Sequence, residues 1–285
     1  MAVKIIKSVK EMKSFSSLAL KDGKTIGFVP TMGYLHDGHI SLLKKANETC
    51  DISIVSIFVN PTQFGPSEDF AKYPRDFERD KELLDANRCC IIFAPEAEEI
   101  YSKSFQTYVE VNKITKILEG VYRPEHFKGV TTIVAVLFNC VKPDYAFFGQ
   151  KDAQQAAVIK RMVEDLKIDV KIQICPIIRE SDGLAMSSRN IYLSEKERQD
   201  ALVLSRSLSQ GKDMILAGER NSGKIISVIS ENISKIASAR MDYAAIVEEK
   251  SFEPAGSLEE GKNYYILIAS RIGSTRLIDN ILVSI

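Results

Sequence analysis

Short apolar runs alternate with segments of helical periodicity along the first two thirds of the chain. The apolar runs lie at 26–30, 52–59, 89–93, 145–148 and 170–175, and each has the length of a strand. Helical periodicity begins at His39 and recurs at 75–86, 130–141 and 152–166. Strands that are apolar without alternation are typical of a parallel sheet whose two faces are covered by helices. We therefore predict an α/β fold for this part of the chain.

The pattern changes after about Arg179. Ser194 and Glu197 have the spacing of a capping box and open a predicted helix that reaches about residue 217. A second helix is predicted over 222–239, and β-like runs follow at 243–247, at 264–269 and at the end of the chain. Because helices precede strands here, we predict two domains, an α/β domain over 1–178 and a smaller α+β domain over 179–285.

Charge and composition narrow the classes of function. The 285 residues include 38 basic and 38 acidic side chains, so no net charge attracts nucleic acid or an anionic membrane. The longest apolar stretch, around 133–141, is much shorter than the ~20 residues that span a bilayer. The N-terminal segment mixes charged and apolar residues, unlike a signal peptide. Five cysteines without a C-x-x-C spacing argue against a disulfide framework or a zinc site, so we expect a reducing cytoplasmic location.

Two of the three histidines, His36 and His39, lie between the first apolar strand and the following helix. The N-terminus of a helix offers unpaired N–H groups and a partial positive charge, which suit a phosphate. Gly33 and Gly38 allow the backbone to turn and to approach a ligand closely, and the imidazoles add hydrogen-bond donors. This segment predicts an anion site. The alternative is a turn capped by two histidines that binds no ligand.

Two further segments place cations where phosphates bind. Lys151 follows the strand at 145–148, and Gln154 and Gln155 lie in the first turn of the next helix, at the sheet edge where α/β proteins bind ligands. Met186-Ser187-Ser188-Arg189 supplies two hydroxyls and a guanidinium on a loop near the predicted domain border. Taken alone, each segment is also compatible with a solvated lysine or a polar interdomain loop.

Other polar residues suit a small substrate better than a phosphate. Asn60 and Gln63 follow the strand at 52–59, and such amides recognise hydroxyls and carboxylates, although Asn-Pro is also common in turns. Arg123 and His126 lie in a loop that precedes the helix at 130–141. The alternative is a solvated basic loop that binds no substrate. Asp80 is a candidate to bind magnesium through water, with an acid on a helix surface as the alternative.

Six blocks of the sequence together resemble the pantothenate synthetase (pantoate–β-alanine ligase) family, in the order in which that family has them. They are PTMGYLHDGH at 30–39, FVNPTQF at 58–64, YPRDFERD at 73–80, RPEHFKGV at 123–130, FGQKDAQQ at 148–155 and DGLAMSSRN at 182–190. The resemblance implies a Rossmann-like N-terminal domain, a small C-terminal lid domain and a homodimer. It also implies that pantoate and Mg-ATP form a pantoyl adenylate and pyrophosphate, after which β-alanine displaces AMP to give pantothenate.

The resemblance also assigns roles to residues of this chain. The expected catalytic residues are His36, His39, Lys151 and Arg189. The expected ATP site comprises Met32, Gly33, Tyr34, Leu35, His36, Asp37, Gly38, His39, Gly149, Gln150, Lys151, Asp152, Ile178, Met186, Ser187, Ser188 and Arg189. Gln63 and Gln155 are expected to hold pantoate, with Gln63 also facing β-alanine and with Asn60, Arg123 and His126 assisting. Asp80 matches an acid associated with magnesium. The family often has Glu in place of Gln150 and Tyr in place of Ala153, and we expect little effect from either difference.

Two alternatives belong to other classes. A different H-x-G-H nucleotidyltransferase would leave the nucleotide on its product, and Gln63 and Gln155 argue against it because they suit a small hydroxy acid. A nucleotide-binding or scaffold module without catalysis would have no need to keep both histidines together with Lys151 and Arg189.

Overall fold

The structure of the chain is a computed structural model that describes residues 3–66 and 68–285. The chain folds into two compact units. The first contains the described residues up to 149 together with 158–176, and the second contains 150–157 and 177–285. Segment 150–157 is thus grouped with the second unit, and the division into a catalytic domain and a lid domain at 178/179 stays a prediction.

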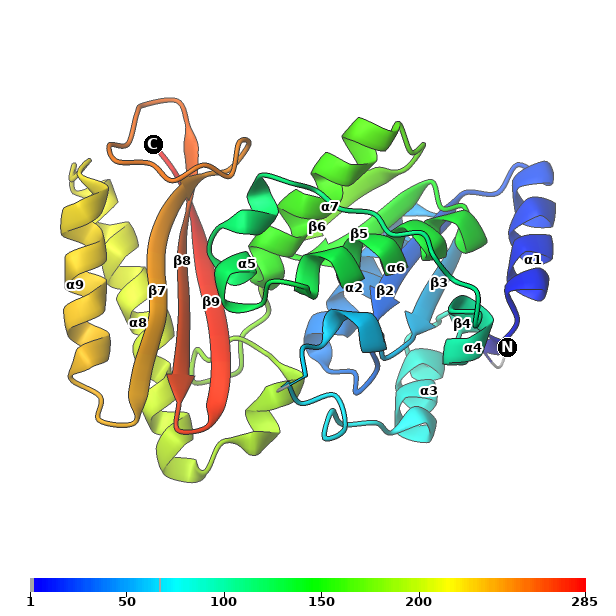
Figure 1. The fold of residues 1–285 in the computed structure, drawn as a ribbon, viewed down its shortest axis with the longest axis horizontal. Coiled ribbons are helices and arrows are strands. Elements are labelled where there is room, and N and C mark those ends of the chain that lie inside the picture. Colours follow the sequence, from blue (N-terminus) through cyan, green and yellow to red (C-terminus); the bar gives the residue numbers. More distant parts are fainter. Residues whose placement is uncertain (1–2, 67) are drawn as a thin grey trace. The chain divides into compact units, whose positions relative to one another are not determined.

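The first unit is built on a six-stranded parallel sheet (Figure 1). The strands are β1 (Lys4–Ile6), β2 (Ile26–Thr31), β3 (Ile52–Ile57), β4 (Ile91–Phe93), β5 (Tyr145–Gly149) and β6 (Lys171–Cys175), in the spatial order β1-β4-β3-β2-β5-β6. All neighbouring pairs of this sheet run parallel. The α/β prediction is confirmed, and β1 is an additional short edge strand.

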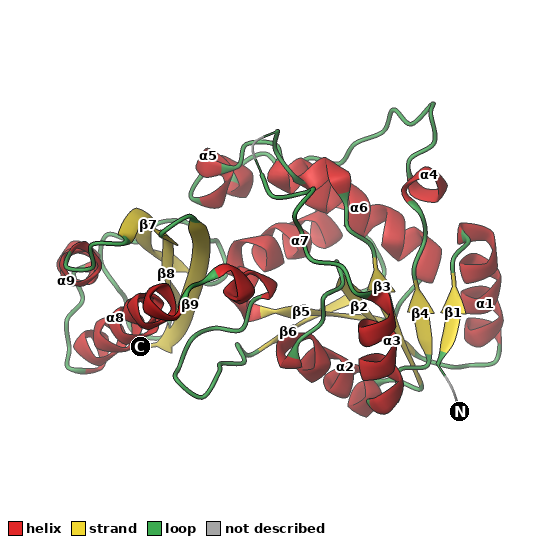
Figure 2. Ribbon diagram, turned by 90° about the horizontal axis from the view of Figure 1, so that it is seen from below, coloured by secondary structure: helices red, strands yellow, loops and turns green. Residues whose placement is uncertain are grey.

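Helices cover both faces of this sheet (Figure 2). On one face lie α1 (Val9–Lys21), α6 (His126–Val141) and α7 (Ala153–Leu166), and on the other lie α2 (Asp37–Thr49) and α3 (Phe77–Ala86). Successive strand residues alternate between the two cores: Phe28 packs with the first set of helices and Val29 with the second. The strands are therefore apolar without alternation, as the sequence predicted.

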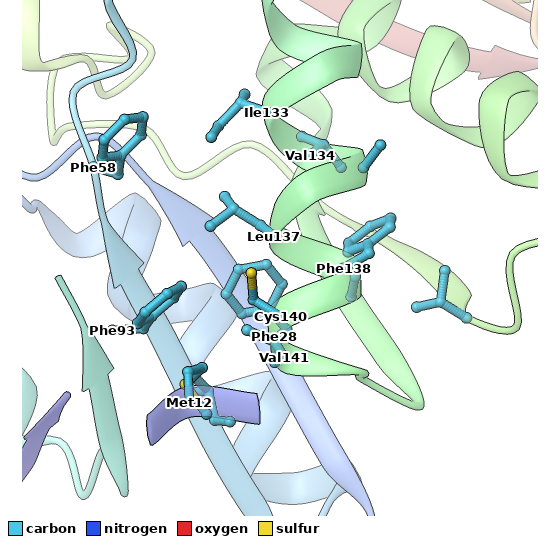
Figure 3. Packing of buried hydrophobic residues seen from close by; sticks show 14 of the residues in the cluster. Met12, Phe28, Phe58, Phe93, Ile133, Val134, Leu137, Phe138, Cys140 and Val141 are labelled. Atoms are coloured by element: carbon cyan, nitrogen blue, oxygen red, sulfur yellow. The ribbon is translucent and has the colours of Figure 1, made fainter. Parts of the chain in front are cut away.

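The core beneath α6 is rich in aromatic and aliphatic side chains. Figure 3 shows Leu137 and Phe138 of α6 facing Phe28 of β2 and Phe93 of β4. The rings of Phe28 and Phe138 meet edge to face, with their centroids 6.3 Å apart. This packing fixes α6 on the sheet and with it the N-terminal turn of α6, which reaches the candidate site.

Strand order reverses between β2 and β5, which are neighbours in the sheet. The chain proceeds from β2 through β3 to β4 on one side, and from β5 to β6 on the other. In open α/β sheets, ligands bind at the carboxyl ends of the strands beside such a reversal. The segment with His36 and His39 follows β2 in sequence, and the segment with Lys151 follows β5.

Several elements of the structure were not predicted. Helix α1 has a narrow buried stripe of Met12, Ser16 and Ala19 among charged neighbours, which gives a weak periodic signal. Its N-cap residue is Ser8, whose Oγ accepts a hydrogen bond of 3.1 Å from Glu11 N. The other unpredicted elements are α4 (Ala97–Ile100), α5 (Glu119–Tyr122), η1 (Pro61–Gln63), η2 (Ile114–Lys116), η3 (Gln150–Asp152) and η4 (Ser188–Tyr192), where η denotes a 3₁₀ helix.

The second unit combines two helices with β-strands, as predicted, and these strands form an antiparallel sheet. The strands β7 (Ala239–Glu248), β8 (Asn263–Ile272) and β9 (Thr275–Ser284) lie in the order β7-β8-β9 and pack with α8 (Glu195–Leu216) and α9 (Ser222–Ser234). The predicted extension of α9 to residue 239 is wrong, because Ala239 already pairs with Ile272 in the sheet. In the described part of the chain, no helix is both long and apolar enough to cross a membrane.

Candidate active site

The turn between β2 and α2 requires an unusual backbone. Gly33 has a φ of +80° and Tyr34 a φ of +50°, so two successive residues are left-handed. A side chain at such a φ is strained, and surrounding interactions must hold it in place. Thr31 supplies one of them, because its Oγ1 accepts a hydrogen bond of 3.1 Å from Gly33 N.

His36 and His39 cap α2 reciprocally. His36 is the N-cap residue, and its Nδ1 accepts a hydrogen bond of 3.1 Å from Gly38 N, while His39 Nδ1 accepts one of 3.3 Å from His36 N. The two rings lie 4.1 Å apart between centroids. A neutral imidazole that accepts at Nδ1 carries its proton on Nε2. Each ring is therefore held with Nε2–H as a donor beside the N-terminus of α2, an arrangement suited to an anion.

Asp80, in the first turn of α3, holds the main chain of this turn. Its Oδ2 accepts from Tyr34 N at 2.6 Å and its Oδ1 from Leu35 N at 2.7 Å, and the side chain is fully buried. Arg79 acts on the same residues, since its Nη2 donates to Leu35 O at 3.0 Å and its guanidinium lies over the Tyr34 ring. The pair stabilises the left-handed turn just before His36.

This geometry bears on the predicted association of Asp80 with magnesium. Burial raises the pKa of Asp80 above its usual value, and the two main-chain N–H groups act in the opposite direction. Both carboxylate oxygens are already used by the protein. Among the described residues no group of three or more His, Cys, Asp or Glu side chains is placed to hold a metal ion. The structure thus gives Asp80 a positioning role, and its association with magnesium stays a prediction.

Gln63 lies at the end of η1 with its carboxamide held by neighbours. Asn60 Nδ2 donates to Gln63 Oε1 at 3.1 Å, and Gln63 Nε2 lies 3.0 Å from Met32 Sδ. Asn60 itself is fixed by Tyr101, whose hydroxyl donates to Asn60 Oδ1 at 2.8 Å. The structure therefore brings together Met32, Asn60 and Gln63, three of the predicted site residues, from segments far apart in sequence.

Arg123 and His126 hold the main chain of Gln63. His126 Nε2 lies 3.1 Å from Arg123 Nη1, which can only donate, so His126 Nδ1 carries the proton and donates to Gln63 O at 3.0 Å. Burial, with the nearby Arg123 cation, lowers the pKa of His126 to about 4. Arg123 forms a two-pronged ion pair with Glu68, through Nε to Oε1 at 2.9 Å and Nη2 to Oε2 at 2.6 Å. These polar groups therefore serve to position Gln63, and direct contact with substrate stays a prediction.

The other predicted site residues lie in the second unit, except Gly149 at the end of β5. Lys151 and its neighbours Gln150 and Asp152 form η3, and Gln155 lies in the first turn of α7. Ser187 caps η4 by accepting a hydrogen bond of 3.3 Å from Arg189 N. Ser188 and Arg189 form the first turn of η4.

The loop that carries Met186 to Arg189 is fixed at both ends. Met186 N donates to Ile178 O at 3.0 Å, and Arg179 and Ala185 form an antiparallel bridge. Arg198 Nη2 of α8 donates to Glu180 Oε2 and to Asp182 Oδ2, each at 2.7 Å. These contacts order the segment on which the predicted phosphate-binding side chains stand.

Sequence reasoning missed the residues that support these side chains. Glu68 and Tyr101 lie outside the six blocks, and Arg79, although it lies within the block at 73–80, was given no role. Asn280 of β9, which donates to Gln150 O and Lys151 O, was also missed. The roles of these residues depend on contacts between distant segments. A partial signal exists for Asn280, since Asp279 and Asn280 interrupt an otherwise apolar strand and are both buried.

Comparison with known proteins places this arrangement in a family. The family model described as pantoate–β-alanine ligase matches residues 4–282. A pantothenate synthetase of Heliobacterium modesticaldum is 50% identical over 283 residues, covering 99% of this chain and 100% of that protein. One from Caldicellulosiruptor saccharolyticus is 53% identical over 281 residues and covers 99% of both chains.

Solved structures agree with these sequence relatives. Pantothenate synthetase from Thermus thermophilus is 40% identical, with a TM-score of 0.91 and coverage of 98% of this chain and 99% of that one. Pantoate–β-alanine ligase from Francisella tularensis, in complex with beta-gamma ATP and β-alanine, is 35% identical, with a TM-score of 0.80 and coverage of 99% and 98%. The chain, with its histidine-capped turn at the reversal of a parallel sheet, therefore belongs to the pantoate–β-alanine ligase family of enzymes.

Proposed function

We propose that this enzyme condenses pantoate with β-alanine at the expense of ATP, through a pantoyl adenylate, and releases pyrophosphate and AMP. The observation that carries the proposal is the reciprocal cap of His36 and His39, which holds two Nε2–H donors at the N-terminus of α2. Family membership supplies the substrates, and the Francisella relative is a complex with beta-gamma ATP and β-alanine.

In the first step, an oxygen of the pantoate carboxylate attacks the α-phosphorus of ATP. The bond from that phosphorus to the bridging oxygen breaks, and pyrophosphate leaves with the electron pair. Negative charge grows on the phosphate oxygens during this displacement, so donors and cations fixed beforehand lower its barrier. His36, His39, Lys151 and Arg189 take this role, helped by the main chain at 32–39 and the hydroxyls of Ser187 and Ser188. Magnesium enters with ATP as part of the substrate.

In the second step, the amine of β-alanine attacks the acyl carbon of the adenylate. The amide C–N bond forms, the C–O bond to AMP breaks, and the nitrogen loses a proton. No nucleophilic side chain is required, because the two substrates supply both nucleophiles. Gln63 and Gln155 hold pantoate, and Gln63 also faces β-alanine. The support for Gln63 is its fixed carboxamide between Asn60 and Met32.

An acyl adenylate hydrolyses when water reaches it, so the enzyme has to shield this intermediate. The assignment of 179–285 as a lid domain follows from the family resemblance, as does the homodimer. Both belong to this proposal.

Product analysis tests the proposed function. ATP, magnesium and pantoate are incubated with the enzyme, with and without β-alanine, and the nucleotides are separated. We expect AMP and pyrophosphate to accumulate over many turnovers only when both co-substrates are present. Pyrophosphate without AMP would indicate a nucleotidyltransferase that keeps the nucleotide on its product. ADP would exclude adenylyl transfer altogether.

A further inference from the structure

Asn280, in the edge strand β9, directs its whole carboxamide at η3. Its Nδ2 donates to the main-chain oxygens of Gln150 and Lys151, each at 2.9 Å, and its Oδ1 accepts from Gln150 Nε2 at 3.1 Å. A carboxamide has two N–H donors and one carbonyl acceptor, so all of its groups are used on this segment. The side chain is 1% exposed.

The neighbouring residue connects this contact to the loop at 179–190. Asn280 N donates to Asp279 Oδ1 at 2.7 Å, and Asp279 receives two hydrogen bonds from Arg179, of 2.7 and 3.0 Å. Arg179 Nη1 also donates to Gly183 O at 3.0 Å. Strand β9, η3 and the beginning of the loop are therefore linked by one hydrogen-bonded network within the second unit.

We propose that Asn280, supported by Asp279 and Arg179, is a positioning residue that fixes the main chain of Lys151, so that the ammonium is in place when the pantoate carboxylate attacks the α-phosphorus. The inference rests on the proposed function, in which Lys151 binds the phosphates of ATP. A lysine ammonium stands on a flexible four-carbon stem, so its placement depends on how firmly its main chain is held. Electrostatic stabilisation of a transition state requires groups that are already in place.

The presence of a buried asparagine at position 280 of β9 supports the positioning role. Buried polar side chains cost free energy unless every group is paired, and an apolar residue would fill a strand core without that cost. The nearby Leu277 and Val283 are apolar in this way. Asn280 instead directs its side-chain hydrogen bonds to the carbonyls of Gln150 and Lys151.

A double-mutant cycle with Lys151 tests the proposal. Asn280→Ala, Lys151→Ala and the double variant are compared with the wild type by the rate of pyrophosphate release from ATP and pantoate in a single turnover. We expect Asn280→Ala to slow this step on the order of 10- to 100-fold, as small displacements of catalytic groups do. Because Asn280 acts through Lys151, the double variant should be no slower than Lys151→Ala alone.

A second measurement separates positioning from general damage. Amide formation from supplied pantoyl adenylate and β-alanine does not require Lys151, so Asn280→Ala should leave its rate within about twofold of wild type. Asn263→Ala is the matched control. It removes a carboxamide of the same sheet that donates to Glu249 Oε2 at 2.8 Å, and it should leave both rates unchanged. Asn280→Asp keeps the size but loses both donors, and it should slow pyrophosphate release as Asn280→Ala does.

The outcomes distinguish an error in the role of Lys151 from an error in the positioning role of Asn280. Full activity of Lys151→Ala would contradict the lysine's role in the proposed function. If Lys151→Ala is slow while both Asn280 variants are normal, the positioning role alone is wrong. Multiplicative losses in the double variant, or equal losses in both half-reactions, would also overturn it. If neither Asn280 variant folds, Asn280 is a residue of the core and not a positioning residue.

Discussion

The carboxylate of Asp80 accepts the main-chain N–H of Leu35 at 2.7 Å, one residue before the histidine that caps α2. Its other oxygen accepts from Tyr34, whose φ is +50°. A buried acid on α3 thus determines the shape of a turn that follows β2. The two imidazoles depend on this turn for their placement. Substitution of Asp80 should therefore slow catalysis through the turn, without Asp80 itself contacting a ligand.

Asp80→Asn should reduce adenylate formation on the order of tenfold or more while the protein stays folded, because an amide NH₂ replaces one oxygen that accepts a main-chain N–H. The measurement is pyrophosphate release over a range of magnesium concentrations. Asp85→Asn is the control, since Asp85 is an exposed acid of the same helix that accepts one hydrogen bond, from Val3 N. Recovery of the Asp80→Asn rate at high magnesium would show that Asp80 acts through the metal ion.

His39→Ala should fold normally and lose on the order of 10² or more in adenylate formation, the usual loss when one fixed donor to a developing oxyanion is removed. Thermal unfolding and single-turnover pyrophosphate release check both parts. Thr49→Ala, at the other end of α2, removes a hydrogen bond of 2.7 Å to Lys45 O and should keep full activity. A His39→Ala enzyme that is unfolded, or that has a near-normal rate, contradicts the role assigned to this ring.

His126 should make the protein less stable in acid. Its pKa is about 4 in the folded chain against about 6.5 when unfolded, so between these values only the unfolded state takes up the proton. Stability is therefore lost as pH falls from about 6.5 to about 4, by on the order of 3 kcal/mol in total.

His126→Asn tests this contribution because it removes the titrating ring. Urea unfolding is measured for both proteins at about pH 7 and about pH 5. Asp80 and Asp279 have raised pKa values, so they stabilise the folded state as the pH falls, opposite to His126. Because both proteins contain these two acids, the difference between their pH dependences gives the contribution of His126. Wild type should lose more stability on acidification than the variant. An identical pH dependence contradicts a buried neutral imidazole.

Gly129→Ala should damage the Gln63 region. A Cβ on Gly129 would lie 2.4 Å from Thr62 O and 2.6 Å from Gln63 N, so α6 and η1 would have to separate. We expect a loss of stability of about 1–3 kcal/mol together with a raised KM for pantoate. Gly256→Ala, where nothing lies within 4 Å, should leave stability and kinetics close to wild type. A normal KM for pantoate in Gly129→Ala would show that η1 does not contribute to pantoate binding.

Periodicity predicted the parallel sheet, because strands such as Ile52–Ile57 are buried on both faces and are therefore apolar throughout. It failed at the end of α9, where Ala, Ser and Ile are compatible with a helix but pairing of Ala239 with Ile272 makes a strand. The motifs predicted the candidate side chains that contact one another in the first unit, such as Asn60 and Gln63.

The supporting residues were out of reach for a physical reason. Asp80 was predicted only in association with magnesium, and Asn280 was not predicted at all. Both act through main-chain groups of other segments, and a main-chain N–H or carbonyl has no sequence signature. The family resemblance assigned Arg123 and His126 to the substrate site. Only the structure shows that their hydrogen bonds go to Glu68 and to the carbonyl of Gln63.

Transfer of oxygen from pantoate to AMP tests the adenylate pathway most directly. Pantoate labelled with ¹⁸O in its carboxylate is converted with unlabelled ATP and β-alanine, and the AMP is analysed by mass spectrometry. Because the carboxylate oxygen bonded to phosphorus stays on AMP when the amine displaces it, the account predicts one labelled oxygen in each AMP formed. Unlabelled AMP, or label in inorganic phosphate together with ADP, would contradict it.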